Sequence, residues 1–177
     1  ADETKARLLA AEQQARVSAE HARERQALLA EASAQFSDSL DTDLIAGLLP
    51  GFCVPLLADV CMVHLFDEGG RLVEAGARAI DESLIEVKRG LRRHREGERS
   101  PWSERGAAGR PQSLLRTDIT DDDYQADARS DEHLELFRRL GARSSLAVPL
   151  VARDRVLGVL TLVANRADRT YSADLVA

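Results

Sequence analysis

Two apolar runs separated by a short polar break stand out between residues 144 and 163. Leu146, Val148 and Leu150 follow the two-residue period of a strand in the first run. The second run is almost wholly apolar, and residues 152–154 have the composition of a turn. The pattern predicts a β-hairpin. Two strands alone cannot cover both of their faces, so the rest of the chain must supply further strands and helices.

A second hairpin is predicted nearer the N-terminus. Residues 60–66 form an apolar run of strand length, residues 67–70 are an Asp-Glu-Gly-Gly turn, and residues 71–78 supply the return strand. A short strand is expected at 112–115. Gly158, inside the later hairpin, predicts either a bend or the close approach of a neighbouring backbone.

Between these strands the apolar positions change to a helical period. Thr120 and Ser130 are good N-cap residues, and Gly141 is placed to end a helix. Pro50 and Pro55 should kink or interrupt the first of these helices. The predicted helices cover residues 42–57, 81–94, 101–108, 121–128 and 131–140, and another begins at 171–175.

Residues 2–40 contain neither Gly nor Pro and have the composition of one long helix. Small and apolar residues recur every seven positions, with a second series three residues later, as in a coiled-coil seam. The first series is Leu8, Ala15, Ala22, Leu29 and Phe36, and the second is Ala11, Ser18, Arg25, Ala32 and Ser39. This seam predicts a parallel homodimer; a solvated linker helix is the alternative.

Composition and charge narrow the possible partners. The net charge of -6 and pI near 5.3 disfavour a nucleic-acid surface, and the basic run at 88–95 is interleaved with Glu residues on either side. The longest uncharged run, 44–58, is short for a membrane span and is broken by Gly and Pro. Two cysteines and the lack of a signal-peptide layout fit a cytoplasmic location. We therefore expect no nucleic-acid partner and no membrane segment in this chain.

The acidic stretch 118–132 has the charge of a calcium-binding loop but not its spacing. An EF-hand loop starting at Asp121 requires Gly at its sixth position, where the sequence has Ala126. No Ser-His-Asp, paired-carboxylate or phosphate-loop spacing occurs either, so we expect no metal site and no catalytic residues in this chain.

The sequence GARSSLAVPLVARDRVLGVLTLV at 141–163, followed by RTYSADL at 169–175, resembles the GAF domain family. The looser similarity extends back to about Leu28. The resemblance implies an α+β fold with a six-stranded antiparallel sheet flanked by helices, a dimer-forming helical layer on one face and a ligand pocket on the other. It divides the chain into a signalling helix, 1–27, and a GAF-like domain, 28–177, whose final helix is truncated.

The N-terminal sequence ADETKAR looks like the linker that follows a PAS domain in bacterial sensor kinases. These resemblances imply a regulatory, non-enzymatic domain of a two-component sensor histidine kinase, which binds a small molecule or relays a signal through a dimeric helix. The alternatives are a ligand-free dimerisation module of a phosphatase or cyclase regulator and, more remotely, a thiol-based methionine sulfoxide reductase. Cys53 and Cys61 are expected to be buried and inert, which disfavours the reductase.

A pocket of the kind the resemblance implies would be walled by helices 101–108, 121–128 and 131–140. His64 is the most informative position, because it is titratable and lies in an otherwise apolar strand. It is either a ligand-binding group, even a haem ligand, or a core histidine satisfied by the backbone. The cyclic-nucleotide pattern and a bilin-attachment motif are not recognisable, so no cofactor is assigned. The expected ligand-binding residues are Met62, His64, Phe66, Trp102, Tyr124, His133 and Phe137.

Overall fold

The structure is a computed structural model, and it describes Gln13, Arg16, Arg23 and residues 42–94, 111–152 and 155–172. The chain divides into two compact units, Ala1–Leu40 and Asp41–Ala177. In the first unit the three described residues are helical and exposed. The predicted seam and the boundary at 27/28 otherwise fall outside the described residues, so the coiled coil and that boundary stay predictions.

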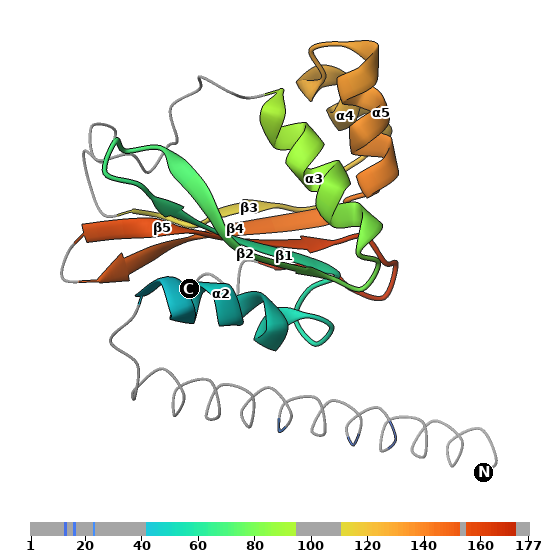
Figure 1. Cartoon of the computed structure of the whole chain (residues 1–177). Helices are drawn as coiled ribbons and strands as arrows, with labels where there is room; N and C mark the ends of the chain where they lie inside the picture. The colour runs from blue at the N-terminus through green and yellow to red at the C-terminus, as the bar shows by residue number, and fades with distance from the viewer. Residues whose placement is uncertain are drawn as a thin grey trace. The chain divides into compact units, whose positions relative to one another are not determined.

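The second unit is built on an antiparallel sheet with strand order β2-β1-β5-β4-β3 (Figure 1). Both predicted hairpins are confirmed. The later turn is shorter than expected, because Ala152 still pairs with Arg155. The described residues hold five strands, and the sixth stays a prediction. Their bounds are β1 Val60–Phe66, β2 Leu72–Ala79, β3 Leu114–Arg116, β4 Ser144–Ala152 and β5 Arg155–Ala164.

Helices cover both faces of this sheet: α2 lies on one face, and α3, α4 and α5 lie on the other (Figure 1). Pro50 is accommodated inside α2, which nevertheless ends before the predicted residue 57. The end at Cys53 is explained by Pro55, which disfavours helical geometry at the preceding residue, Val54. The helix predicted at 101–108 lies outside the described residues. The bounds are α2 Thr42–Cys53, α3 Ser83–Arg93, α4 Asp121–Asp127 and α5 Asp131–Leu140.

The predicted helix caps are confirmed. The Asp123 carboxylate accepts hydrogen bonds from the Thr120 backbone N–H and hydroxyl, each at 2.8 Å. The Ser130 hydroxyl accepts from the His133 N–H at 3.1 Å, and Gly141 ends α5 in the left-handed conformation, with φ 61°. These local interactions satisfy N–H groups that the first turn of each helix leaves without helical partners, and they fix where α4 and α5 begin.

Side chains of β1 alternate between two hydrophobic clusters. Cys61 points into the cluster on the α2 face, together with Cys53 and Leu162. Val60 and Met62 point into the cluster beneath α3 and α5, together with Val87 and other apolar side chains of those helices. The strand is therefore buried on both faces, as its sequence predicts.

A buried carboxylate ties the start of β1 to the chain that leaves β5. Asp59 is 1% exposed, and its Oδ2 accepts hydrogen bonds from the backbone N–H groups of Asn165 and Arg166 at 2.9 and 3.1 Å. The Arg169 Nη1 lies 3.5 Å from the other carboxylate oxygen. This network holds together two segments that are more than a hundred residues apart in sequence.

Among the described residues, none of the helices has the length and apolar character needed to cross a membrane.

Candidate functional site

His64 lies on β1 two residues after Met62, so its side chain is on the same face of the sheet, which α3 and α5 cover. Only 6% of the residue is exposed. Its Nε2 is buried and makes no hydrogen bond to any residue that the structure describes. Since buried polar atoms in folded proteins nearly always have a partner, this nitrogen marks the position as a candidate site.

Glu74 on β2 is paired with His64 across the sheet, so the two side chains share one face. The guanidinium of Arg89, on α3, hydrogen-bonds to both oxygens of this carboxylate. Its Nε donates to Oε2 at 2.9 Å, and its Nη2 donates to Oε1. Arg89 also pairs with Glu86. The hydrogen bonds from Arg89 lower the pKa of Glu74, and the two carboxylates raise the pKa of Arg89. Glu74 and Arg89 therefore form a bidentate ion pair beside His64.

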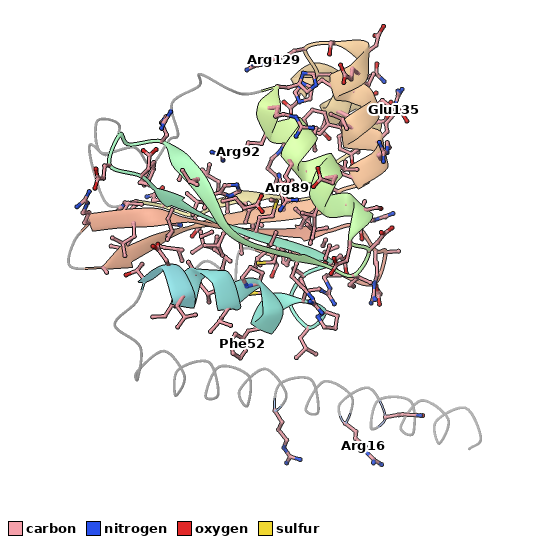
Figure 2. The ribbon with its side chains drawn as sticks, in the orientation of Figure 1. Arg16, Phe52, Arg89, Arg92, Arg129 and Glu135 are labelled. Atoms are coloured by element: carbon pink, nitrogen blue, oxygen red, sulfur yellow. The ribbon has the colours of Figure 1, made fainter. Side chains whose placement is uncertain are left out.

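Arg92 and Lys88 bring further positive charge to this face. The Arg92 guanidinium donates a hydrogen bond to the Leu72 carbonyl, which fixes it against β2. Figure 2 shows Arg89 and Arg92 between α3 and the strands. Burial first, and then the charges of Arg92 and Lys88, lower the pKa of His64 to about 4, although Glu74 opposes the shift. The imidazole is therefore neutral at neutral pH.

An apolar cluster continues from His64 along the sheet. Val159 is the β5 partner of His64, and Phe66 lies two residues further along β1. The cluster consists of Val156 and Val159, with Phe66, Leu72 and Ala147 packed against them. His64 thus stands between this cluster and the core that contains Met62.

The helices contribute a row of stacked rings. Tyr124 stacks on Phe137 with ring centroids 5.6 Å apart, Phe137 lies 4.7 Å from His133, and His133 stacks on His94 at 4.6 Å. The Tyr124 hydroxyl donates a hydrogen bond to the Ala142 carbonyl at 2.5 Å, and the Arg129 N–H donates to His133 Nδ1 at 3.2 Å. The row packs α3, α4 and α5 together.

The predicted ligand-binding residues therefore fall into groups. Met62 is 1% exposed inside the core, and Phe137 packs against that same cluster. His64 and Phe66 form the strand side of the candidate site, whereas Tyr124 and His133 belong to the ring row with Phe137. Trp102 lies outside the described residues.

Sequence reasoning missed the charged neighbours of His64, namely Glu74, Lys88, Arg89 and Arg92. A signal was present, because Lys88 and Arg92 are four residues apart on one predicted helix, and the 67–70 turn brings Glu74 close to His64.

Cys53 and Cys61 are buried at 6% and 0% exposure and lie in the same hydrophobic cluster. The neighbouring Cys53 side chain and burial both raise the pKa of Cys61, so its thiol stays protonated. Among the described residues, no group of three or more His, Cys, Asp or Glu side chains is placed to hold a metal ion.

The fold defines a class of small α+β domains, in which an antiparallel sheet carries helices on both faces. A sequence model of the GAF domain family matches residues 53–176. The chain belongs to the GAF domain family, as the resemblance at 141–175 predicts.

Solved structures with this fold have low sequence identity to the chain. The GAF domain of the cyanobacteriochrome TePixJ is 22% identical, with a TM-score of 0.54 over 79% of this chain and 82% of that one. The GAF domain of a phosphoenolpyruvate-protein phosphotransferase from Coxiella burnetii is 15% identical, with a TM-score of 0.52 over 86% and 84%. The phycocyanobilin-bound GAF domain of a cyanobacterial phytochrome is 14% identical, with a TM-score of 0.51 over 85% and 84%. No curated protein matches the sequence.

Proposed function

We propose that this chain is a sensory domain of a bacterial signal-transduction protein, a sensor histidine kinase, and that it binds a small molecule on the sheet face covered by α3–α5. The observation that carries the proposal is the buried Nε2 of His64, which has no hydrogen-bond partner among the described residues. The domain itself is regulatory and performs no catalysis. Its signal passes to the parent protein through the N-terminal helix of a homodimer.

The buried imidazole favours a ligand over a purely structural histidine. A buried polar group without a hydrogen bond costs about 1–3 kcal/mol, so a core histidine is normally satisfied by a backbone group. His64 Nε2 has no such partner among the described residues. A bound molecule that supplies the missing hydrogen bond removes this cost, and removes it only in the ligand-bound state, as a sensor requires.

The choice of parent protein has separate support. The ADETKAR sequence is similar to linkers that follow PAS domains in bacterial sensor kinases, and the GAF family is one of sensory modules. The phytochrome neighbour contains phycocyanobilin. This chain lacks a recognisable bilin-attachment motif, so that ligand is not part of the proposal.

A second candidate is a ligand-free dimerisation module of a phosphatase or cyclase regulator. The ring row favours it, because three of the residues expected to bind a ligand, Tyr124, His133 and Phe137, pack on one another instead. A methionine sulfoxide reductase is disfavoured by the burial of both thiols.

A thermal-shift screen with nucleotides, haem and small metabolites tests whether this face binds a ligand. A ligand present at about 100 times its dissociation constant adds roughly 2.7 kcal/mol to the free energy of unfolding. For a domain of this size we expect a rise in Tm of roughly 5–10 °C. If no compound raises Tm, and an experimental structure shows the space beside His64 filled by side chains, the ligand-free module replaces the sensor.

A further inference from the structure

We propose that a cleft at the end of the sheet where β1 begins binds a small zwitterion of the α-amino acid class, with the ligand carboxylate on Arg143 and the ligand ammonium group on Asp118. This site is separate from the face beside His64, and the inference goes beyond the proposed sensory function.

The cleft is formed by three segments of the chain: the loop between β3 and α4, the residue before β4, and the chain that follows β5. Its volume is about 260 Å³. Pockets for drug-sized ligands begin at roughly 300 Å³, so a cleft of this size suits a small metabolite. The residues that line it are Asp118, Ile119, Thr120, Arg143 and Thr170.

Hydrogen bonds hold all three segments in place. The Ile119 N–H donates to the Arg143 carbonyl at 2.9 Å, and the Arg143 N–H donates to the Ala164 carbonyl at 2.8 Å. The third segment is anchored by Tyr171, whose N–H donates to the Ser144 hydroxyl at 3.2 Å. Because the backbone around the cleft is fixed before a ligand arrives, binding costs less conformational entropy.

The cleft has one side chain of each charge, and the two are not paired. Neither the Asp118 carboxylate nor the Arg143 guanidinium makes a hydrogen bond or an ion pair within the part of the chain that the structure describes. The carboxylates of α4 have partners of their own, because Asp121 pairs with Arg138 and Asp123 caps the helix. Asp118 and Arg143 are therefore available to a ligand.

An α-amino acid complements both charges at once. Its carboxylate accepts hydrogen bonds from a guanidinium, its ammonium group donates to a carboxylate, and hydrogen bonds between charged groups are stronger than neutral ones. An anion without the ammonium group would place its charge near Asp118 with nothing to offset the repulsion, and a simple cation would meet Arg143 in the same way. Ile119 supplies apolar surface for a short aliphatic side chain.

The cleft lies well away from His64. Ser144, next to Arg143, pairs with Ala164 at the end of β5, whereas His64 pairs with Val159, five residues earlier on that strand. At about 3.3 Å per residue, the separation along the strand is roughly 17 Å. Binding at the cleft can therefore be tested independently of the ligand proposed beside His64.

An NMR titration of the full chain, followed through its backbone amide signals, tests the site with three probes taken into the millimolar range. The probes are L-valine, isovalerate, which lacks the ammonium group, and L-valinamide, which lacks the carboxylate. We expect L-valine to shift the amide signals of residues 118–120, 143 and 170. It should bind at least about tenfold more tightly than either analogue, because only the amino acid satisfies both charges.

Variants of the two charged residues test their roles. Asp118→Asn and Arg143→Gln should each weaken L-valine binding by about tenfold or more. Asn is chosen because, like Asp, it tolerates the positive φ of 50° at this position. Arg78→Gln is the matched control, since Arg78 is an exposed arginine on β2, at an edge of the sheet, and should leave binding unchanged.

Several outcomes would overturn the inference. Equal affinities for L-valine and its two analogues, or equal effects of Arg143→Gln and Arg78→Gln, would contradict the zwitterion assignment. If none of the probes shifts the signals of the cleft, the site itself is wrong. His64→Leu should bind L-valine as the wild type does; loss of binding would assign L-valine to the face beside His64, which refutes this inference and leaves the sensory function intact. Asp118 and Arg143 are exposed, so their variants remain informative even if His64→Leu does not fold.

Discussion

His64 and Asp59 are both buried polar residues at β1, and their partners differ. The Asp59 carboxylate accepts two backbone N–H groups and lies near two arginines. Among the described residues, neither His64 Nε2 nor the second Asp59 oxygen has a hydrogen bond, but the Arg169 and Arg166 side chains lie 3.5 and 3.7 Å from that oxygen. Asp59 therefore has the contacts of a structural group, whereas the proposed sensory function assigns His64 to ligand binding.

The charge state of His64 should make stability depend on pH. Its pKa falls from 6.5 in the unfolded chain to about 4 in the folded chain, because of burial and of Arg92 and Lys88, opposed by Glu74. Between these values the unfolded chain binds more protons, so the free energy of unfolding falls as pH decreases through that window. The loss between about pH 7 and about pH 5 should be about 2 kcal/mol. Urea unfolding at both pH values measures it. An equal loss in His64→Leu would show that another group is responsible.

Asp59→Ala should be strongly destabilising. It leaves the N–H groups of Asn165 and Arg166 and the side chain of Arg169 without their carboxylate. Breaking a buried ion pair by removing one partner costs about 3–5 kcal/mol. Asp168→Ala is the control, because the Asp168 side chain is 68% exposed and its pair with Arg166 should be worth less than about 1 kcal/mol. Equal effects of the two substitutions in chemical denaturation would refute the structural role of Asp59.

Strands β1 and β5 approach each other closely at Gly158. Gly158 is paired with Leu65, and a Cβ built at Gly158 would lie 2.1 Å from the His64 carbonyl oxygen. The close backbone approach that the sequence predicts at this glycine is therefore present. It positions β5 directly beside the strand that carries the candidate site.

Gly158→Ala should lower the free energy of unfolding by about 3 kcal/mol or more, because the two central strands must separate to admit a methyl group. Gly51→Ala provides the contrast. Gly51 lies in α2 with nothing within 4 Å of the added Cβ, and the substitution should stabilise the helix by up to about 1 kcal/mol. Thermal unfolding of both variants checks the pair. A tolerated Gly158→Ala would contradict the described β1–β5 spacing.

The elements that the sequence predicts well are those with local signals. The 144–163 hairpin has a two-residue period with a turn between, and the Thr120, Ser130 and Gly141 caps depend on neighbours within a few residues. The candidate site depends on distant partners. The pairing of β1 with β2 shifts between Val63 and His64, where Ala75 of β2 is the extra residue, and this shift sets Glu74 opposite His64. Hydrophobic periodicity does not reveal such a shift.

Contacts between residues far apart in the sequence are harder still to predict from the sequence. Asp59 meets Asn165 across 106 residues, and nothing in the local sequence pairs the two. The sequence did not predict the ring row. Aromatic residues such as Tyr124, His133 and Phe137 are typical of a pocket wall, but helix packing decides whether their rings face a ligand or one another.

We assign dimerisation and signal transfer to the N-terminal helix. Deleting residues 1–27 should lower dimer affinity, which light scattering over a concentration series measures. Ala22→Leu should strengthen the dimer by adding apolar area to the predicted seam, and should lock the parent kinase in one output state. Ala30→Leu, outside the seam, is the control. A dimer equally tight without residues 1–27 would place the interface on the domain itself.

If this GAF domain senses a small molecule, native mass spectrometry of freshly purified protein should detect that molecule on the folded chain. We expect a dimer that retains a small molecule, and a His64→Leu variant that has lost the retained mass while remaining folded. Wild-type protein whose mass equals that of the polypeptide alone, and which still gains no mass when incubated with the compounds of the thermal-shift screen, would contradict the claim.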